Sequence, residues 1–490
     1  MRQNYINGEW VGTNGKDSSI IINPANGKKI ASVVRATPQD VEVAIAAARA
    51  AAAADSEWRS LSPGNRSKLL HKVADCIDAK RDEIAQIETQ NQGKTLFDAN
   101  FDVELGAGFF RSMASMTGAL GGQTFDTMPG LHTMTIREPL GVCAIIAPWN
   151  YPFYLMTQYS SMALAAGNAI ICKPSEITPM SAIALFEIFD EVGFPKGVVN
   201  LVTGKSSEIG DLLTGSDNID KVAFIGSTKI GRHVMKASAE SNFKHLTLEL
   251  GGKSPCIVFD DADLDNALDH VALGAFMNSG QTCTAGSRIL LQDGIYDVFL
   301  ERFIKCISNL KIGDGSDKDV QIAPMTSEAQ MNRVLQFIET GVKEGATIAY
   351  GGKRVTDNGL ENGFFIEPTV FVNVKNHMTI VQEEIFGPVV TVQRFTTEEE
   401  AVELANSTVY GLAAGIFTSD GARALRMAKA VESGTIYVNN YFSSVNEAPC
   451  SALKQSGIAQ EMGVAGLEGY TKIKQVNITT KMHPAGFIDY

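Results

Sequence analysis

From about residue 140 to residue 250, the sequence alternates short apolar segments with segments of helix length. Stretches such as "SAIALFEIFDEVG" and "SSEIGDLLTG" separate the apolar segments. This alternation predicts right-handed β-α-β units and therefore an α/β fold, with an open parallel sheet covered by helices on both faces. The predicted strands are "GVCAIIA" (141–147), "NAIICK" (168–173), "GVVNLV" (197–202), "KVAFI" (221–225) and "HLTLEL" (245–250).

A second alternating region extends from about 253 to 440 and contains apolar segments such as "PCIVF", "SRILLQ" and "GTIYVNN". We interpret it as a second α/β domain, because 490 residues exceed what one hydrophobic core usually supports. Residues 38–53 and 62–117 are predicted to be helical, since Pro38 begins a run of good helix formers and apolar residues recur at helical spacing.

Two further segments are rich in β-branched residues but fall outside both alternating regions. They are "LHTMTIREPL" (131–140) and "TKIKQVNITTK" (471–481). Peripheral strands of this kind often pair between subunits, so we expect an oligomer. Surface hairpins on a monomer remain the alternative.

Composition excludes several classes of function. A net charge of −13 argues against a nucleic-acid-binding surface and against docking on acidic membranes. No apolar run approaches the ~18 residues that span a bilayer, and the start "MRQNYINGEW" does not resemble a signal peptide. Seven cysteines without a C-x-x-C pair indicate reduced thiols in a cytoplasmic protein and no metal site.

Ligands of parallel sheets bind at the carboxyl ends of the strands, so the loops there are the candidate sites. "FIGSTKIG" joins a strand to a helix and could present backbone N–H groups to a phosphate, although it lacks the G-x-G-x-x-G pattern. "CKPSE" places Lys173 and Glu176 where a carboxylate could accept the hydroxyls of a ribose. Each loop alone is equally compatible with an ordinary turn.

Two more loops carry polar side chains suited to catalysis. In "APWNYP", the amide of Asn150 could donate to a developing oxyanion, or Asn150 could simply form a turn. In "LELGGKSP", Glu249 ends an apolar strand, where desolvation would raise its pKa towards the range of a general base. A structural glutamate bonded to backbone is the alternative.

Cys283 differs from the other cysteines because it lies in a polar, glycine-containing loop, "NSGQTCTAGSR". A thiolate becomes nucleophilic where backbone dipoles or nearby donors support it. The sequence therefore makes Cys283 a candidate nucleophile.

Together these segments resemble the aldehyde dehydrogenase superfamily. "PWNYP", "KPSE", "GSTKIG", "LELGGKSP", "GQTCTAGSR", "EEIFGPV" and "YGLAAGIFT" occur in that family's order and spacing, and the resemblance extends from "YINGEWV" to "YTKIK". The chain looks most similar to the non-acylating, NAD-linked branch that includes betaine-aldehyde and broad-range aldehyde dehydrogenases.

The resemblance implies a covalent mechanism. Cys283 would attack the aldehyde carbon to form a thiohemiacetal, and Asn150 with the backbone N–H of Cys283 would stabilise the oxyanion. After hydride transfer, Glu249 would activate the water that hydrolyses the thioester.

The resemblance also implies binding residues. Lys173 and Glu176 would hold the adenosine ribose, and Glu176 favours NAD over NADP. The pyrophosphate would lie at Gly226 and Ser227, and the nicotinamide end at Trp149, Glu384 and Phe386. The remaining cofactor residues would be Pro148, Ser175, Gly231 and Leu250. The substrate pocket would contain Tyr151, Gln158, Thr282, Thr284 and Tyr441.

A domain division follows from the same resemblance. It comprises a Rossmann-type NAD-binding domain (1–120 and 140–250), an oligomerisation hairpin (121–139), an α/β catalytic domain (251–450) and a return to the first domain with an oligomerisation tail (451–490). A homodimer or homotetramer is expected.

The sequence departs from the family pattern at three places. Gln158 and Tyr159 occupy positions that are often Trp-Lys in the family. Glu461 is present in "SGIAQE", but its usual basic neighbour is not. "PCSALK" (449–454) replaces two glycines near the mouth of the substrate tunnel. A proton relay through lysine is therefore unsupported.

These departures bear on the substrate. Betaine aldehyde requires a cage of aromatic faces, and Gln158 removes one of them. We therefore expect a small aliphatic or aromatic aldehyde, with betaine aldehyde as the alternative. A CoA-acylating enzyme is disfavoured by the presence of Glu249. A cysteine hydrolase is disfavoured because no histidine lies in these loops, and a non-catalytic protein because every site residue is present.

Overall fold

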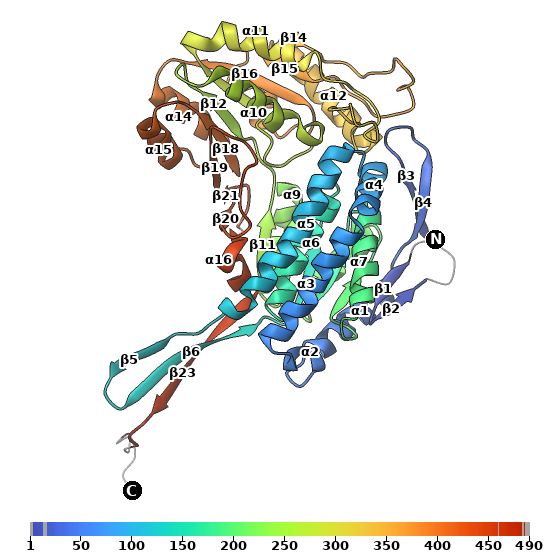
Figure 1. The fold of residues 1–490 in the computed structure, drawn as a ribbon, viewed down its shortest axis with the longest axis vertical. Coiled ribbons are helices and arrows are strands. Elements are labelled where there is room, and N and C mark those ends of the chain that lie inside the picture. Colours follow the sequence, from blue (N-terminus) through green and yellow to red (C-terminus); the bar gives the residue numbers. More distant parts are fainter. Residues whose placement is uncertain (1–2, 13–16, 459, 483–484, 486–490) are drawn as a thin grey trace.

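The computed structural model describes residues 3–12, 17–458, 460–482 and 485. It contains two seven-stranded sheets and a smaller antiparallel sheet that projects from the body (Figure 1). The first sheet has the order β11-β10-β7-β8-β9-β1-β2, and its first five strands are parallel. These strands are β1 (Asn4–Ile6), β2 (Glu9–Val11), β7 (Val142–Ile146), β8 (Ala169–Lys173), β9 (Val199–Leu201), β10 (Lys221–Ile225) and β11 (His245–Glu249).

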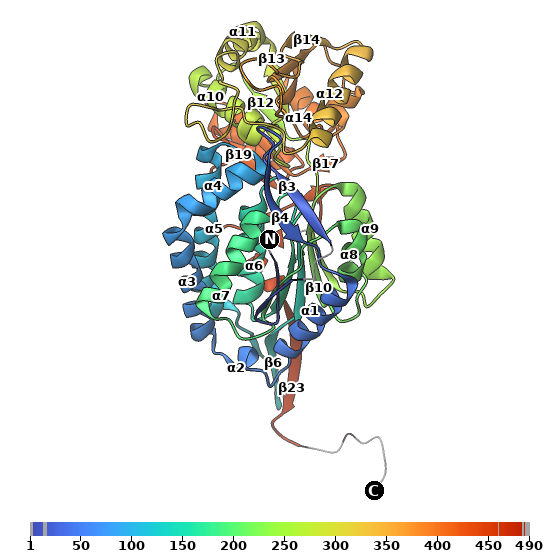
Figure 2. The same cartoon turned by 90° about the vertical axis from the view of Figure 1, so that its right-hand side faces the viewer.

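Helices cover both faces of this first sheet. Figure 2 shows α3 to α7 on one side and α1, α8 and α9 on the other. Every residue of β7, β8 and β10 is buried, as expected of a parallel sheet covered on both faces. The helices are α1 (Pro38–Ala51), α2 (Glu57–Ser60), α3 (Pro63–Ala79), α4 (Arg81–Gln92), α5 (Leu96–Met116), α6 (Pro152–Ala165), α7 (Met180–Val192), α8 (Ser206–Thr214) and α9 (Thr228–Ala239).

The second sheet has the order β14-β15-β16-β13-β12-β18-β19, and β14 is its antiparallel strand. Successive residues of β12 and β13 face different cores: Cys256 and Ile289 pack against one set of helices, and Ile257 and Leu290 against the other. The strands are β12 (Pro255–Val258), β13 (Arg288–Gln292), β14 (Thr347–Tyr350), β15 (Thr369–Val372), β16 (Val389–Phe395), β18 (Ala413–Phe417) and β19 (Thr435–Val438).

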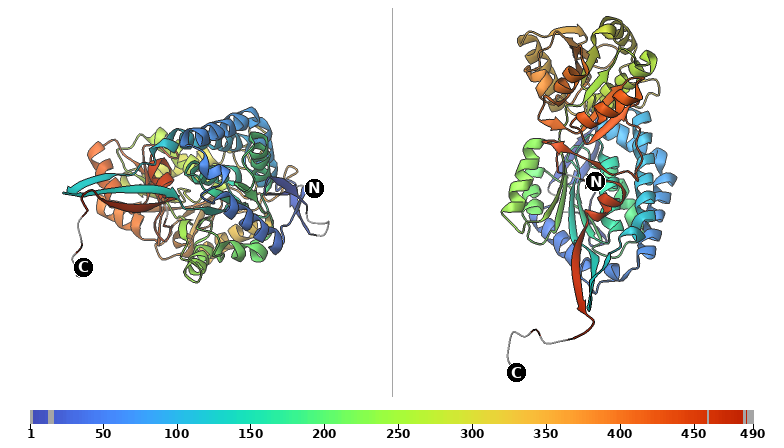
Figure 3. Two further views of the ribbon diagram at one scale, coloured as in Figure 1. Left: turned by 90° about the horizontal axis from the view of Figure 1, so that it is seen from below. Right: turned by 90° about the vertical axis from the view of Figure 1, so that its left-hand side faces the viewer.

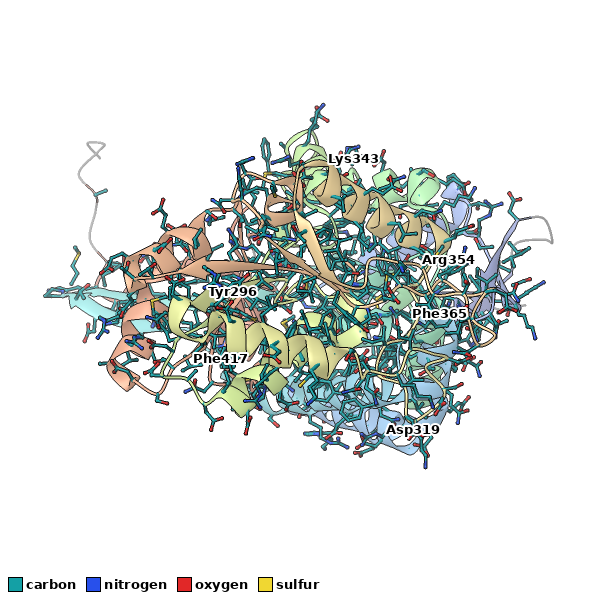
Figure 4. The ribbon with its side chains drawn as sticks, turned by 90° about the horizontal axis from the view of Figure 1, so that it is seen from above. Tyr296, Asp319, Lys343, Arg354, Phe365 and Phe417 are labelled. Atoms are coloured by element: carbon teal, nitrogen blue, oxygen red, sulfur yellow. The ribbon has the colours of Figure 1, made fainter. Side chains whose placement is uncertain are left out.

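Five longer helices and several short ones accompany this second sheet. Figure 4 looks down on this end of the molecule, where Lys343, the last residue of α12, lies at the outer edge and Phe417 of β18 lies inside. The helices are α10 (Leu264–Phe276), α11 (Tyr296–Ile307), α12 (Glu328–Lys343), α13 (Thr379–Gln382), α14 (Glu398–Asn406) and α15 (Gly421–Ala430), with η2 (Met277–Gly280) and η3 (Asp293–Ile295).

The two segments predicted as peripheral strands pair with each other. Strand β6 (Leu131–Pro139) lies between β23 (Thr471–Thr479) and β5 (Thr124–Met128) in a separate antiparallel sheet. Both views in Figure 3 show this sheet projecting away from the body. Several of its apolar side chains are exposed, among them Phe125, Met128 and Ile473.

Shorter elements connect the two large sheets. The hairpin of β3 (Ser18–Ile22) and β4 (Lys29–Val34) reaches from the first sheet to the second, where Phe364 N–H donates to the Pro24 carbonyl at 3.1 Å. The remaining elements are η1 (Thr117–Ala119), β17 (Tyr410–Gly411), β20 (Cys450–Ser451), β21 (Leu453–Lys454), β22 (Gln460–Glu461) and α16 (Gly463–Glu468).

The α/β prediction with parallel sheets is therefore confirmed, and each predicted strand of the first sheet agrees with the structure to within two residues at either end.

Candidate active site

The loop that carries Cys283 leads from η2 to β13 and is held rigidly. Asn278 and Ser279 have positive φ angles of 50° and 55°, which residues other than glycine seldom adopt. The chain therefore turns sharply just before the cysteine. Behind the turn, Gln281 Oε1 accepts from Thr326 N–H at 2.9 Å and Gln281 Nε2 donates to the Asn278 carbonyl at 3.1 Å. These bonds fix the position of the thiol.

Asn150 is tied directly to this loop. Its Nδ2 donates to the Gln281 carbonyl at 2.9 Å, and its own carbonyl accepts from Asn278 Nδ2 at 2.9 Å. Because a side-chain amide has two N–H groups, one remains for a ligand beside Cys283. The neighbouring Tyr151 shares a hydrogen bond of 2.8 Å with Thr282 Oγ1. The loop after β7 and the cysteine loop are thus joined as one unit.

The loop after β11 also approaches the cysteine closely. A Cβ atom added to Gly252 would lie 2.2 Å from the Cys283 carbonyl oxygen, so only glycine allows this approach. Three residues earlier, Glu249 ends β11 and lines the same two cavities as Cys283. The strand end and its glycine turn therefore bring a carboxylate and a thiol into one site.

A second buried carboxylate accompanies Glu249. Glu461 accepts a hydrogen bond of 3.1 Å from Gln158 Nε2 and a second bond, very short, from the Tyr159 hydroxyl. Burial raises the pKa of Glu461 to about 7. Burial, and then the charge of Glu461, raises the pKa of Glu249 well above its ordinary value. Two carboxyls this close and this buried resist ionising together.

The surroundings of Cys283 favour the thiol over the thiolate. Burial raises its pKa most, the charges of Glu249 and Glu384 raise it further, and a hydrogen bond from Thr284 N–H lowers it. A thiolate is the nucleophilic form of cysteine. Cys283 must therefore lose a proton before it can attack a substrate.

Two cavities meet at Cys283. The larger, about 410 Å³, lies between α5, α6 and the segment 434–462, and the smaller, about 220 Å³, lies between the strand ends of the first sheet and α12. Cys283, Glu249 and Ile225 line both. The smaller cavity is walled by the rings of Trp149 and Phe386, which meet edge to face with centroids 5.1 Å apart. A thiol at such a junction can meet two ligands from opposite sides.

Beside the larger cavity, α5 is anchored by a buried charge cluster. The ammonium of Lys94 is bonded to the Asp102 carboxylate and lies 3.6 Å from Glu88. It also lies 4.2 Å from the centre of the Tyr151 ring. The single cation thus neutralises carboxylates next to the cavity wall.

Comparison with known proteins identifies the chain. The model of the aldehyde dehydrogenase family matches residues 10–476. The chain belongs to the aldehyde dehydrogenase family. It is accordingly an oxidoreductase that acts on aldehydes.

Individual members of the family are similar over nearly the whole chain. An aldehyde dehydrogenase of Emericella nidulans is 45% identical over 474 residues, which are 96% of this chain and 94% of that protein. A betaine aldehyde dehydrogenase of Bacillus subtilis is 42% identical, with 97% of each chain covered. The crystal structure of a betaine aldehyde dehydrogenase from Staphylococcus aureus in complex with NAD+ superposes with a TM-score of 0.97, at 40% identity over 100% of this chain and 97% of that one.

Most of the site residues predicted from the sequence are brought together. The three predicted catalytic residues, Cys283, Glu249 and Asn150, all line the smaller cavity. The predicted cofactor residues that line the same cavity are Pro148, Trp149, Gly226, Ser227, Leu250, Glu384 and Phe386.

Four predicted cofactor residues lie outside the lining of that cavity. Lys173 and Glu176 meet at the first turn of α8: Lys173 Nζ donates to Ser206 Oγ at 2.9 Å, and Glu176 Oε2 accepts from Ser206 N–H at 3.0 Å. Burial lowers the pKa of Lys173 to about 8, and the charge of Glu176 partly opposes this shift. Ser175 lies in the turn between them, and Gly231 packs on Leu250.

The predicted substrate residues fall into two groups, according to whether they line the larger cavity. Tyr151, Gln158, Thr282 and Thr284 line the larger cavity. Tyr441 is not among the residues that line this cavity. Its ring is buried in the second core against Gly274 and Gly415, and its hydroxyl donates to the Thr284 carbonyl at 2.7 Å. Tyr441 therefore supports the cysteine loop from behind.

Sequence reasoning missed several lining residues. In the smaller cavity these are Ile225, Gly251, Gln330 and Arg333. The side chains of Gln330 and Arg333 donate to the backbone carbonyls of Phe386 and Glu384. In the larger cavity they include Tyr154, Tyr437, Phe442, Cys450 and Met462. A signal existed for Tyr154, because it follows Tyr151 and precedes Gln158 at the spacing of one helix face. The sequence contains no such signal for the segment 434–462, because its position beside the larger cavity depends on the tertiary structure.

The described residues contain neither a candidate membrane-spanning helix nor a candidate metal site. No helix there is long and apolar enough to cross a membrane. Likewise, the described ranges hold no group of three or more His, Cys, Asp or Glu side chains arranged to bind a metal ion.

Proposed function

We propose that this enzyme oxidises an aldehyde to a carboxylic acid with NAD+, through a thioester on Cys283 that water hydrolyses. One observation carries the proposal: Cys283 and Glu249 line both cavities. An aldehyde in the larger cavity and a cofactor in the smaller one would then meet at the sulfur. The carboxylate needed for hydrolysis lies at the same junction.

The smaller cavity fits a nicotinamide nucleotide. Helix α9 begins at this cavity, and Ser227 is its N-cap, so backbone N–H groups are available to a pyrophosphate. Glu384 Oε1 accepts from Gly252 N–H at 2.9 Å, which orients the carboxylate towards a ribose. The crystallised relatives contain NAD+. Bound NAD+ supplies the hydride acceptor, and Glu176 disfavours the 2′-phosphate of NADP.

The residues around Cys283 perform the oxidation. Once deprotonated, the sulfur bonds to the aldehyde carbon, and the carbonyl oxygen becomes an oxyanion. The free N–H of Asn150 and the backbone N–H of Cys283 stabilise this charge. Loss of hydride from the same carbon then leaves the thioester.

Glu249 completes the reaction. Its raised pKa makes it a stronger base than an ordinary carboxylate, and it removes a proton from the water that attacks the thioester. The acid product leaves and the cysteine is restored. No lysine contacts Glu461 within hydrogen-bond distance among the described residues, so Tyr159 and Gln158 occupy the place of the family's basic relay.

We propose a neutral aliphatic or aromatic aldehyde of modest size as the substrate. The rings of Tyr151, Tyr154, Tyr437 and Phe442 line the larger cavity, and apolar and aromatic walls suit such molecules. Betaine aldehyde is the second candidate, because two of the similar proteins carry that name and aromatic faces attract cations.

The predicted domain division and assembly belong to the same proposal. The segments 1–120, 140–250 and 451–490 would bind the cofactor, and 251–450 would form the catalytic domain. The hairpin 121–139 pairs with β23 in the projecting sheet, and its exposed apolar residues suit contact with a second subunit of a homodimer or homotetramer. A cytoplasmic location is proposed from the cysteine content.

The test is NADH formation across a panel of aldehydes, for the unaltered enzyme and for Cys283→Ala. We expect turnover with the unaltered enzyme and none with Cys283→Ala. The matched control is Cys306→Ala, since Cys306 is exposed on α11 and should be dispensable. Activity that survives in Cys283→Ala would refute the covalent mechanism.

A further inference from the structure

The tyrosines around Cys283 differ in whether their hydroxyls have a protein partner. Tyr151, Tyr159 and Tyr441 each make a hydrogen bond, to Thr282, Glu461 and the Thr284 carbonyl respectively. Tyr154 and Tyr437 make none with any described residue. Among the tyrosines around Cys283, these two hydroxyls are therefore available to a ligand.

Both tyrosines with unpartnered hydroxyls line the larger cavity. The hydroxyl of Tyr470 is buried from solvent without a partner, whereas those of Tyr154 and Tyr437 are not buried in this way. Cys450 and Cys283 line the same cavity as these two tyrosines. Tyr154 and Tyr437 are thus part of the wall of the cavity that contains the nucleophile.

The two rings are held by packing. Tyr154 meets Phe109 edge to face with centroids 5.0 Å apart, and Tyr437 lies 4.9 Å from the Tyr441 ring and 6.4 Å from Phe442. Burial raises the pKa of Tyr437 to about 12 and that of Tyr154 well above its ordinary value, so both remain hydrogen-bond donors at neutral pH. Fixed donors lose little entropy when they bind a ligand.

We propose that Tyr154 and Tyr437 form a polar subsite that binds a neutral oxygen acceptor on the distal end of the aldehyde. The subsite favours aromatic aldehydes that carry a hydroxyl or alkoxy group. This inference rests on the proposed function and refines its substrate class. It makes Tyr154 and Tyr437 the residues that determine specificity in the larger cavity.

Charge around the cavity favours a neutral acceptor over an ion. An anionic substituent would meet Glu249 and Glu461, which line the same cavity. Asp102, which lines the same cavity, is already paired with Lys94, and a cationic substituent such as an ammonium cannot accept a hydrogen bond from the two hydroxyls. A neutral oxygen avoids the repulsion and accepts from the two donors. A flat aromatic ring between that oxygen and the carbonyl suits the walls formed by Tyr151 and Phe442.

The experiment compares two aldehydes of nearly equal shape. 4-Methoxybenzaldehyde carries the oxygen acceptor, and 4-ethylbenzaldehyde replaces that oxygen with a methylene group. The readout is the ratio of their kcat/KM values, measured by NADH formation in the unaltered enzyme, Tyr154→Phe, Tyr437→Phe and the double variant. The control is Tyr350→Phe, which alters a tyrosine on β14 outside the cavity. Comparing ratios cancels the different intrinsic reactivity of the two aldehydes.

We expect each cavity variant to lower the methoxy-to-ethyl ratio roughly three- to tenfold, the size of one neutral hydrogen bond. Tyr350→Phe, which lies outside the cavity, should leave both the ratio and the turnover of each aldehyde unchanged. An unchanged ratio in the double variant, with turnover intact, would overturn the subsite and leave the proposed function standing. Absence of any NADH formation by the unaltered enzyme would overturn both. A preference for betaine aldehyde that the Phe variants leave intact would also overturn the subsite, because their aromatic faces survive.

Discussion

The two cavities that meet at Cys283 are built in different ways. The smaller is lined mainly by the turns that follow β7, β10 and β11, where backbone geometry and glycine decide what fits. The larger is lined by side chains from α5, α6 and the segment 434–462, which come together only in the folded chain. A cofactor site formed by turns can be recognised from short local sequence motifs. A substrate site formed by helix faces depends on individual side chains, and these can change without altering the fold.

Glu249 lines both cavities. Replacing it therefore tests whether thioester formation can be separated from thioester hydrolysis. We expect Glu249→Gln to lower steady-state turnover about 10³-fold, the usual scale for loss of a general base. A first burst of NADH, about one per subunit, should remain, since the thioester can form but hydrolyses slowly. Stopped-flow measurement of NADH separates the burst from the steady state.

The control for this variant is Glu399→Gln, on the exposed first turn of α14. It should match the unaltered enzyme in both phases. If Glu249→Gln keeps its steady-state rate, Glu249 is not the base, and Cys283 is the reacting group that the two cavities share.

Replacing Glu176 tests the cofactor site without altering the substrate cavity. Glu176→Ala removes the carboxylate that would repel a 2′-phosphate, so the ratio of kcat/KM for NADP to that for NAD should rise about tenfold. The ranking of aldehydes should not change, because Glu176 does not line the larger cavity. Initial rates with each cofactor give the result.

The neighbouring Glu208→Ala serves as the control, since Glu208 lies on α8 and pairs with Arg35 and Lys205. An unaltered cofactor ratio in Glu176→Ala would show that the proposed discrimination lies elsewhere.

The same contrast explains what the sequence could predict. Strands β7, β8 and β10 were predictable because each is a short apolar run bounded by turns, and parallel order follows from the helices between them. Glu249 was predictable because it ends such a strand, and Asn150 because it lies in the loop that follows one. The resemblance to the family supplied their roles, which the residues alone left open.

The larger cavity was harder to predict because its walls depend on contacts between distant segments. Tyr441 has the aromatic character expected of a substrate residue, yet Gly274, Gly286 and Gly415 leave space that its ring fills inside the second core. Tyr437, four residues earlier and on β19, lines the cavity instead. No local pattern decides between them, since that depends on how the chain leaves the strand.

Replacing Glu461 should have the smallest effect on kcat. It is also the most specific test of the difference between the two cavities, because Glu461 lines only the larger one. Glu249 acts as a base when ionised, and the charge of Glu461 raises its pKa. Glu461→Gln removes that charge, so the pKa of Glu249 falls. The acidic limb of the kcat–pH profile should then move to lower pH, by about one unit at most.

Tyr159→Phe should move the same limb in the same direction by a smaller amount. The Tyr159 hydroxyl favours the ionised form of Glu461, so without it the pKa of Glu461 rises above about 7 and the carboxyl stays neutral to higher pH. The negative charge near Glu249 is then smaller over the pH range in which Glu249 acts as a base. Glu399→Gln should leave the limb in place. A shift to higher pH in Glu461→Gln would mean that Glu461 assists the ionisation of Glu249, and that the larger cavity supplies the proton acceptor for hydrolysis rather than an opposing charge.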